Sequence, residues 1–389
     1  MSSQRPLSDA DLFSDATLLD PYPTYRNLRD LAGAVWMTRS EAFAVTRFDD
    51  VRSALRNWRV FSSGRGVGMN EPINERIAGN TLSSDPPRHS LLRQILARPL
   101  SPPAMRTFTE QVARQAETIV ERLVAQRDFD AATDLAQFLP TSIISFLVGL
   151  PEQGRERMLE WGHAAFNTLG PLNQRCLDSM EVARGLIDYA MKIDPAELRP
   201  DGWAALAFAA AARGEITLAD ARLLILDYVG PSLDTTIFAT SSAIWLFGLH
   251  PDQWQLLCNN PALIPGAINE VVRLESPIQI FSRYVTSDTD IDGVVVPAGS
   301  RAMIVYGSAN RDERQWDNPD IFDIRRKAGE QLAFGHGIHM CVGMPLARLE
   351  LRCLLEALVK RVKRFELGEV RRARNNTLRG LEKVAVKVH

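Results

Sequence analysis

The sequence predicts a mainly α-helical protein with a smaller β region. Long stretches before residue 276 are typical of helices, and Met105–Gln126 repeats its apolar residues at helical spacing. Within the stretch 217–249, almost every residue of Leu223–Phe247 is apolar or small, which indicates a long helix buried on all sides. After Ser276-Pro277 the chain turns to runs rich in valine and isoleucine, which are typical of strands.

The part of the chain before residue 80 predicts short elements followed by one irregular loop. Asp49-Asp50 suits a helix cap because its carboxylates accept hydrogen bonds from free backbone N–H groups. The loop is rich in glycine, and long loops tend to be functional. The predicted elements are a helix at Thr24–Leu31, strands at 35–37 and 42–46, a helix from the Asp49-Asp50 cap to about Trp58, and the loop Ser62–Asn80.

The middle of the chain predicts a series of helices separated by glycine and proline. Gly149 and Pro151 end one helix, and Gly214 ends another. Thr217 and Asp220 form a variant of the capping box, which begins the long buried helix. The turn Gly170-Pro171 is expected to form the roof of a pocket. The predicted helices are Met105–Gln126, Leu135–Leu150, Glu152–Asn167, Leu177–Met191, Trp203–Arg213 and 217–249.

The last third of the chain predicts the β region and one further helix. A turn at Asp292-Gly293 divides one of the apolar runs, as expected for a hairpin. The predicted elements are strands at 280–286, 291–296 and 302–306, a helix at Met344–Val362, and strands within the tail 377–389, with a turn at Thr377-Leu-Arg-Gly380.

Composition excludes several classes of protein. The net charge of −2 and the isoelectric point near 6.3 give no sign of a nucleic-acid partner. The four cysteines are sparse and unpatterned, which argues against a disulfide framework and predicts a reducing, cytoplasmic location. Met1–Ser14 is polar and acidic, without a signal-peptide core or a spanning segment, so no membrane association is expected.

A glycine-rich stretch, Phe334-Gly-His-Gly-Ile-His-Met-Cys-Val-Gly343, places Cys341 directly before a helix. Backbone N–H groups of the loop and the positive end of the helix are both expected to lower the pKa of this thiol. The glycines allow the backbone to approach something flat and bulky. A buried structural cysteine in a turn is the alternative, but the length of the pattern favours a functional thiolate.

This stretch closely resembles the haem-binding signature of the cytochrome P-450 family, and the resemblance extends over almost the whole chain. It implies haem b (iron protoporphyrin IX) as cofactor, with Cys341 as the axial ligand of the iron. A thiolate ligand pushes electron density into the iron and favours O–O cleavage. The resemblance also implies that Phe334 packs near the sulfur, that Gly343 lies close to the haem and that His339 reaches a haem propionate.

Two further segments are candidates for holding the propionates. In Asp85-Pro-Pro-Arg-His89-Ser-Leu-Leu-Arg93, the prolines mark a helix start, and His89 and Arg93 share a face that could hold a carboxylate. From the residues alone, a solvated basic face is the commoner outcome for such a pair. The resemblance implies instead that both side chains bind the haem, and that Arg283 is the remaining propionate-binding arginine.

An acid and a hydroxyl stand side by side within the long apolar helix, in Pro231-Ser-Leu-Asp234-Thr235-Thr236. Bonding of Thr235 to the helix backbone, with a partnered Asp234, is one explanation. The resemblance is to the oxygen-activation motif of the family, and it implies that Asp234 relays protons and Thr235 stabilises activated oxygen. Pro231-Ser232 departs from the usual small pair, and we expect the helix to bend or widen near residues 227–231 because Pro231 lacks an N–H group.

Glu270 and Arg273 lie three apart near the end of another predicted helix and can pair on one face. An ordinary surface pair of this kind contributes little to stability. The resemblance implies a buried structural pair that Arg326 joins. It further implies one domain, residues 1–389, with the long central helix over the haem and a β region drawn from both ends of the chain and residues 280–306.

The activity implied is that of a haem-thiolate monooxygenase, which inserts one atom of O₂ into an organic substrate by hydroxylation or O-/N-dealkylation. Electrons are expected from NAD(P)H through a ferredoxin reductase and a separate ferredoxin. Arg88, Arg98, Arg348 and Arg352 could form its dock, although they are equally compatible with ordinary solvated surface. A haem-binding sensor without turnover and a peroxide-driven oxygenase are the alternatives; neither needs the pair Asp234 and Thr235.

The substrate is expected to be small and aromatic. Glu275-Ser-Pro-Ile-Gln279 and Ser63-Gly-Arg65-Gly-Val-Gly68 look similar to bacterial members of the family that oxidise such compounds. Asp227 lies eight residues before Thr235, and the family places that position in the pocket wall. A carboxylate there needs a partner, which is either a neighbouring group or a donor on the substrate. The candidate pocket residues are Arg65, Asp227, Ser232, Ile278 and Leu378.

Overall fold

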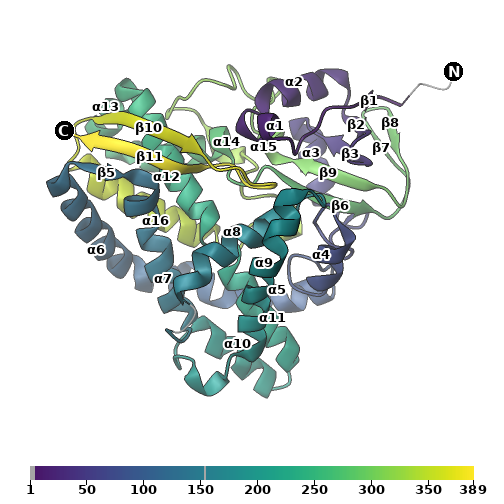
Figure 1. The fold of residues 1–389 in the computed structure, drawn as a ribbon, viewed down its shortest axis with the longest axis horizontal. Coiled ribbons are helices and arrows are strands. Elements are labelled where there is room, and N and C mark those ends of the chain that lie inside the picture. Colours follow the sequence, from purple (N-terminus) through teal and green to yellow (C-terminus); the bar gives the residue numbers. More distant parts are fainter. Residues whose placement is uncertain (1–4, 153–154) are drawn as a thin grey trace.

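The structure is a computed structural model that describes residues 5–152 and 155–389. Helices fill most of the molecule, and strands gather along its upper edge in the view of Figure 1. The predicted class, mainly α with a smaller β region, is confirmed. The α-helices are α1 (Asp15–Leu19), α2 (Tyr22–Leu31), α3 (Phe48–Arg56), α4 (Glu71–Arg76), α5 (Arg88–Ala97), α6 (Pro102–Gln126), α7 (Phe138–Val148), α8 (Met158–Thr168), α9 (Gln174–Lys192), α10 (Trp203–Ala212), α11 (Leu218–Val229), α12 (Asp234–Leu249), α13 (Pro251–Asn259), α14 (Ile264–Glu275), α15 (Tyr306–Ala309) and α16 (Met344–Val359).

Short strands and turns complete the chain. The strands are β1 (Leu7–Ser8), β2 (Ala34–Met37), β3 (Ala42–Val45), β4 (Phe61–Ser62), β5 (Asp128–Asp130), β6 (Ile280–Val285), β7 (Thr289–Ile291), β8 (Val294–Val296), β9 (Arg301–Val305), β10 (Phe365–Arg372) and β11 (Leu381–Val388). A π-helical turn forms at Ala131–Ala136, and 3₁₀ turns form at Arg98–Leu100, Arg155–Arg157, Pro195–Glu197, Pro261–Leu263, Ala328–Glu330 and Gly337–His339.

The main sheet joins the N-terminal strands to the segment after α14. Its order is β1-β2-β3-β9-β6-β4, and β3 pairs with β9 in parallel although more than 250 residues separate them. Every residue of β3 is buried, so the middle of this sheet is covered on both faces. β7 and β8 form a separate hairpin, in which Asp292 and Gly293 both have positive φ, as the tightest hairpin turns require.

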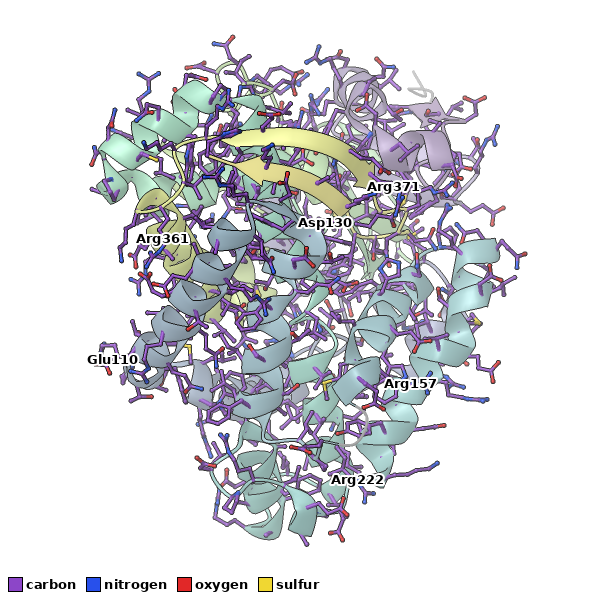
Figure 2. All side chains as sticks on the ribbon, turned by 60° about the vertical axis from the view of Figure 1, so that its left-hand side comes forward. Glu110, Asp130, Arg157, Arg222, Arg361 and Arg371 are labelled. Atoms are coloured by element: carbon purple, nitrogen blue, oxygen red, sulfur yellow. The ribbon has the colours of Figure 1, made fainter. Side chains whose placement is uncertain are left out.

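The C-terminal strands belong to a second sheet. β10 and β11 pair as an antiparallel hairpin, and β11 also pairs with β5 of the chain's first half. The β region therefore draws on both ends of the chain, as predicted, and its described strands are divided among three sheets. In Figure 2, Asp130 lies just below the yellow hairpin, where its carboxylate accepts a hydrogen bond from the backbone N–H of Val384 at 3.0 Å.

Several predicted helix boundaries differ from those of the structure by a few residues. Asp49 and Asp50 lie in the first turn of α3 rather than at its cap, which is Arg47. The loop 62–80 contains the helix α4, which Asn70 caps by accepting a bond from the N–H of Ile73. The start of the helix predicted at Glu152–Asn167 falls on residues 153–154, which lie outside the described residues; α8 begins at Met158.

The long helix predicted at 217–249 is divided into α11 and α12, so the prediction of one continuous helix is wrong. The capping box of Thr217 and Asp220 begins α11 as expected. The interruption covers Gly230–Leu233 and includes Pro231, which has no N–H to donate to the carbonyl of Asp227. The expected opening of the helix at this proline is thus confirmed, and α6, with 25 residues, is longer than either half.

Side chains take over hydrogen bonds at this interruption. The hydroxyl of Ser232 donates to the carbonyl of Tyr228, and the hydroxyl of Thr235 donates to the carbonyl of Pro231 at 2.8 Å. Two carbonyls that a continuous helix would use are therefore satisfied without it. The break is a built feature of the chain rather than a frayed end.

The turn between α8 and α9 is tied down by asparagine amides, which we call the amide clasp (Asn70, Asn167, Asn173 and Asn376). Asn70 donates to the carbonyls of Thr168 and Gly170 at 2.8 and 2.7 Å. Asn376, from the segment before β11, donates to the carbonyl of Asn167 at 2.9 Å and accepts from Asn173 at 2.9 Å. A Cβ on Gly170 would lie 2.4 Å from the Cβ of Asn376, so only glycine fits there.

A buried ion cluster joins α14 to the segment that leads to the Cys341 loop. Glu270 receives two bonds from Arg273, at 2.7 and 2.8 Å, and one from Arg326, at 3.0 Å. Glu270 and Arg273 have no solvent-accessible surface, and Arg273 also donates to the carbonyls of Asn310 and Pro319. The predicted triad is therefore present, and it is structural.

One stretch, Ala131–Val148, is long and apolar enough to cross a membrane, and 61% of it is buried inside the protein. It consists of the π-helical turn and α7, which pack against α6 and α12. A core helix passes the same test of length and composition. No membrane segment is inferred from it.

We predict that Glu270→Gln destabilises the protein by about 3–5 kcal/mol, because the buried Arg273 and the partly exposed Arg326 then lose their carboxylate. The measurement is urea unfolding followed by far-ultraviolet circular dichroism. The matched control is Glu110→Gln on α6, whose pair with Arg114 is exposed; the Glu110 side chain projects from the surface in Figure 2. The control should change stability by less than about 1 kcal/mol. Equal losses in the two variants would contradict the structural role.

Candidate active site

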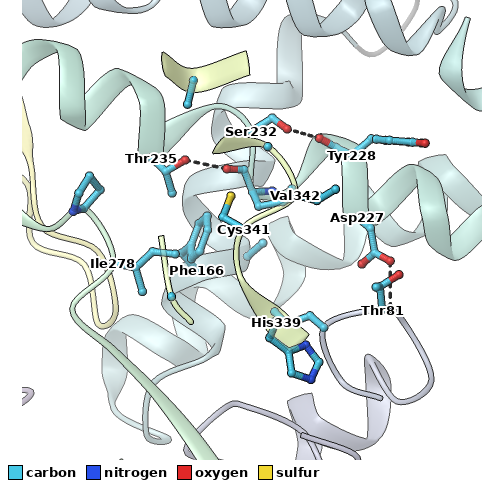
Figure 3. Close-up of a pocket in the computed structure, with 18 of the residues that line it drawn as sticks. Thr81, Phe166, Asp227, Tyr228, Ser232, Thr235, Ile278, His339, Cys341 and Val342 are labelled. Carbon is cyan, nitrogen blue, oxygen red and sulfur yellow. Dashed lines mark hydrogen bonds between the residues drawn. The ribbon is translucent and has the colours of Figure 1, made fainter. Parts of the chain in front are cut away.

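A large cavity lies between the Cys341 loop and the interrupted helix α11–α12. Segments from α5, α8, β6 and α16 complete its walls, and it contains about 2100 Å³ of empty space, part of it open to solvent. Figure 3 shows Cys341, Thr235, Ile278 and Phe166 around the same space. Most of the lining is apolar, which suits a flat, bulky ligand together with a second, smaller molecule.

The Cys341 loop is shaped by its glycines and closed by backbone hydrogen bonds. Gly335 and Gly337 have φ near +72° and +70°, and a Cβ on Gly337 would lie 2.4 Å from the carbonyl oxygen of Leu55. The N–H of Cys341 donates to the carbonyl of Phe334 at 2.8 Å. The loop therefore cannot relax its shape without disturbing α3, and it presents the cysteine at the start of α16.

The Cys341 thiol faces the cavity and is surrounded by protein on its other sides. Its exposed surface is thus cavity surface, and removal from bulk water raises the pKa of the thiol. The backbone N–H groups of Gly343 and Met344 and the charge of Arg93 act in the opposite direction. In the free chain, burial therefore outweighs the expected lowering of the thiol pKa by the loop and the helix. Binding of a metal cation would reverse the balance, since a coordinating thiol is deprotonated.

Four basic side chains gather beside the loop, and the sequence had singled out all of them. His89 and Arg93 come from α5, Arg283 from β6, and His339 from the loop itself; the rings of the two histidines are 4.4 Å apart. Burial and then the neighbouring positive charges lower the pKa of His89, and the same causes lower that of His339 to about 2. Burial and the repulsion between these positive groups therefore favour the uncharged form of both histidines.

Within the described part of the chain, no carboxylate pairs with these four side chains. Both ring nitrogens of His89 and one of His339 are buried without a hydrogen-bond partner, and Arg283 donates only to the carbonyl of Ser282. Unpaired buried polar atoms of this kind need an explanation. A group that carries carboxylates would satisfy them, so the residues fit a porphyrin with two propionates.

Thr235 and Asp234 point to different sides of α12. Thr235 lines the Cys341 cavity, close to the helix interruption (Figure 3). Asp234 does not line it: its side chain is 8% exposed and its Oδ2 lies 3.1 Å from Nδ1 of His163 on α8. The acid and the hydroxyl are adjacent in sequence, yet they are not adjacent in one cavity.

Three of the five predicted pocket residues line the cavity: Asp227, Ser232 and Ile278. Asp227 accepts a bond from the backbone N–H of Thr81 at 3.0 Å (Figure 3). Burial raises the pKa of its carboxyl group to about 6, although the bond from Thr81 and the charge of Arg88 act to lower it. The partner of Asp227 is therefore a neighbouring backbone group, and the carboxyl still faces the cavity.

The other two predicted pocket residues lie elsewhere. Arg65 is exposed and stacks on the ring of Tyr284 at 4.4 Å, so it does not face Asp227. Leu378 is buried behind the wall, where its backbone pairs with that of Ile278 in an isolated bridge. Both were inferred from short local patterns, which do not determine on which side of a turn a residue lies.

Sequence reasoning missed three functional candidates: His163, Thr81 and Glu350. His163 and Thr81 reach their acids across 71 and 146 residues, and no spacing rule links them. Glu350 lines the cavity from α16, and burial raises the pKa of its carboxyl group to about 8. An acid within the apolar run Leu349-Glu350-Leu351 was the one signal that could have identified it.

The chain matches known proteins over nearly its full length. It is 35% identical to the protein named Cytochrome p450 CYP199A2 from Rhodopseudomonas palustris, over 97% of this chain and 93% of that protein. The chain belongs to the cytochrome P450 family. The family model, described as Cytochrome P450, matches residues 257–381. The beta-dihydromenaquinone-9 omega-hydroxylase of Mycobacterium tuberculosis is 31% identical, over 98% of this chain and 79% of that protein.

Solved structures agree with this assignment. The crystal structure of CalO2 superimposes with a TM-score of 0.85 at 25% identity, over 98% of both chains. An intact type IV self-sufficient cytochrome P450 monooxygenase does so with a TM-score of 0.83 at 27% identity, over 98% of this chain and 53% of that one. This P450 is therefore a monooxygenase, an oxidoreductase with a haem cofactor that uses O₂, a small-molecule substrate and redox partners.

We predict that Cys341→His abolishes the strongly red-shifted Soret band that a thiolate ligand gives in the reduced, carbon monoxide-bound protein. The reason is that the Cys341 loop positions the sulfur and the backbone N–H groups of Gly343 and Met344 donate hydrogen bonds to it. The matched control is Cys258→Ser, because Cys258 lies on α13, away from the cavity. The control should keep the band. A band that survives in Cys341→His would show that another residue binds the iron.

Proposed function

We propose that this P450 inserts one atom of O₂ into a small aromatic substrate, by hydroxylation or by O- or N-dealkylation. Haem b, held by Cys341, would supply the oxygen chemistry when bound. The observation that carries the proposal is the shared cavity: the thiol of Cys341, the hydroxyl of Thr235 and an apolar wall face one space. We propose that residues 1–389 form a single haem domain.

The residues of the chain have separable tasks in this proposal. His89, Arg93, Arg283 and His339 would bind the propionates, and Phe334 and Gly343 would pack near the sulfur and the ring. Phe334 is itself braced by the guanidinium of Arg348, 5.3 Å from its ring. The apolar wall excludes bulk water from the reacting space, and the hydroxyl of Thr235 offers a proton donor beside it. Asp234 would supply protons to this hydroxyl from the opposite face of α12.

The wall that would hold the substrate is mainly aromatic and aliphatic. Phe166, Trp203 and Phe281 contribute rings, and Leu226 and Ile278 contribute aliphatic groups. Apolar walls with few polar groups suit a flat, largely apolar molecule. Asp227 and Glu350 are carboxyl groups on this wall whose pKa burial raises, to about 6 and about 8. Asp227, which is ionised near neutral pH, would contact the polar end of the substrate.

The redox partner is proposed to be a separate ferredoxin, reduced by NAD(P)H through a ferredoxin reductase. The expected dock needs revision, because Arg88 pairs with Asp220 at 2.5 Å and Arg98 with Glu215 at 3.1 Å. Arg352 on α16 has a side chain that is 41% exposed and is 3.8 Å from Glu356, and Arg348 bonds to Asn269. The face beside α16 is thus the better candidate, through Arg352. A cytoplasmic location without membrane or nucleic-acid partners remains a prediction from composition.

Of the alternatives, a non-catalytic sensor does not fit a chain whose relatives are monooxygenases. A peroxide-driven oxygenase would share the fold and the haem site. The presence of both Asp234 and Thr235 favours the route that uses NAD(P)H and O₂, and product formation with NADH and a ferredoxin system, but without added peroxide, would separate the two.

We predict that Thr235→Ala keeps NADH consumption but diverts it from product to hydrogen peroxide. Thr235 presents a hydroxyl group of α12 to the cavity directly beside the helix interruption. Product and peroxide are measured per NADH in the same reaction. Ser241→Ala, which removes a buried hydroxyl of α12 outside the cavity, is the matched control. Unchanged coupling in Thr235→Ala would contradict the assignment.

We predict that Asp227 discriminates among ligands of equal size by charge. Its pKa near 6 means that the carboxylate forms as pH rises through that value. Binding of para-methoxybenzylamine should therefore tighten roughly tenfold between pH 5 and 7, about 1.4 kcal/mol. Binding of para-methoxybenzoate should weaken, and that of para-methoxyphenol should change little. Spectral titration of the haem gives all three affinities.

In Asp227→Asn the pH dependence of the amine and the acid should disappear. Asp188→Asn, which removes an exposed carboxylate from α9, is the control and should behave like the unmodified protein. If all three affinities move by one factor, or none moves, Asp227 does not contact the substrate.

A further inference from the structure

A second cavity lies behind α12. Asp234, Ile237 and Phe238 line it, whereas Thr235, Thr236 and Ala239 line the Cys341 cavity. At about 100° per residue these two sets occupy opposite faces of one helix. A single helix therefore separates the two spaces. The second cavity contains about 1040 Å³ of empty space, part of it open to solvent, which is ample for ordered water.

One histidine connects this cavity to the buried acid. Nδ1 of His163 lies 3.1 Å from Oδ2 of Asp234, and the side chain of His163 is 42% exposed whereas that of Asp234 is 8% exposed. The ring thus has water on one side and the carboxylate on the other. Its backbone is held in place, because the carbonyl of His163 accepts a bond from the amide of Asn375 at 3.2 Å.

The groups that face His163 favour its charged form. Carboxylates line the cavity from four of the elements packed around it: Glu160 on α8, Asp178 on α9, Asp234 on α12 and Glu382 on β11. The uncharged Gln137 faces it from the start of α7. The nearby arginines are already paired, Arg157 with Glu160 at 3.2 Å and Arg371 with Glu382. Burial lowers the pKa of His163, but Asp234 and Glu382 more than offset this and raise it.

We propose that His163 is the solvent-side proton donor of this enzyme, which passes protons from the water of the second cavity to Asp234. The inference rests on the proposed function, in which Asp234 serves Thr235. No sequence pattern points to His163, and His163 does not line the Cys341 cavity. It would act through Asp234, so it is a positioning and proton-supplying residue.

The step balances in protons and needs no further reagent. The Nδ1–H bond of the imidazolium breaks and an O–H bond forms on Oδ2 of Asp234, which leaves a neutral imidazole and a carboxylic acid. The acid then rotates about its side-chain bonds towards Thr235 and gives its proton to the hydroxyl oxygen of Thr235, as that hydroxyl passes its own proton into the Cys341 cavity. Once the acid has turned away, Nδ1 is no longer covered by the carboxylate and takes a proton from a hydronium ion or a buffer acid of the solvent, which restores the imidazolium.

The first test measures the pair without turnover. In the diamagnetic, carbon monoxide-bound ferrous protein, NMR titration of the imidazole signals of the six histidines identifies His163 as the signal lost in His163→Gln. We expect it to titrate above the ordinary value of about 6.5, and to move to lower pH in Asp234→Asn. Unshifted titration in the intact protein, or no response to Asp234→Asn, would overturn the proposal.

The second test is a pH profile of product formation from the tightest-binding of the three methoxy-aromatic compounds, with NADH and a surrogate ferredoxin system. A donor must be protonated, so the rate should fall as pH rises through the raised pKa of His163. In His163→Gln the rate should drop roughly three- to tenfold at low pH and lose this decline. In Glu382→Gln the decline should remain but move to lower pH, because one of the charges that raise the pKa of His163 is removed.

Two controls separate the possible failures. The carbon monoxide band should be unchanged in His163→Gln, which shows that the haem site is intact, and His389→Gln, far from both cavities, should have the profile of the unmodified enzyme. If the profile of His163→Gln equals that of the unmodified enzyme while Thr235→Ala still diverts NADH to peroxide, this inference fails alone. If the unmodified enzyme forms no NADH-dependent product, the proposed function fails and this inference with it.

Discussion

One electrostatic constraint dominates the site: the sulfur of Cys341, which we propose binds the haem iron as a thiolate, lies where burial opposes negative charge. The chain answers with fixed dipoles rather than with a neighbouring full charge in contact, since the N–H groups of Gly343 and Met344 address the sulfur. That arrangement requires the positive φ at Gly337, where Leu55 of α3 leaves no room for a side chain. The Cys341 loop thus packs directly against α3, which in turn contacts β9 of the main sheet.

Buried charge also supports the segment that leads to the Cys341 loop. The cluster of Glu270, Arg273 and Arg326 costs desolvation, yet Arg273 holds the carbonyls of Asn310 and Pro319 while Asn310 accepts the N–H of Leu332 just before the loop. The basic cluster of His89, Arg93, Arg283 and His339, which we propose binds the propionates, shows the opposite state, with no carboxylate partner among the described residues. The first cluster has its counter-charge within the chain, whereas the second would gain one from the bound propionates.

Local signals in the sequence predicted the local features well. The glycine-rich loop, the Asp292-Gly293 hairpin, the capping box at Thr217 and the opening at Pro231 each depend on backbone geometry that a few adjacent residues decide. The location of Thr235 in the cavity wall, and the gathering of His89, Arg93, Arg283 and His339 beside the loop, could be predicted because the family resemblance supplied their neighbours. Contacts between distant segments could not: the parallel pairing of β3 with β9, the bond from Thr81 to Asp227 and the pair of His163 with Asp234 depend on packing. The misplacement of Arg65 and Leu378 has the same cause.

The amide clasp has a consequence for the rigidity of the cavity wall. It fixes the turn between α8 and α9, where Leu169 is part of the cavity lining, with hydrogen bonds from buried asparagine amides as well as with the apolar packing of Leu169. Each such bond that is broken is replaced by one to water, so the net cost is about 0.5–1.5 kcal/mol per bond rather than its full strength. The rigidity of this part of the cavity wall therefore depends on how well solvent competes for the amides, in addition to hydrophobic burial.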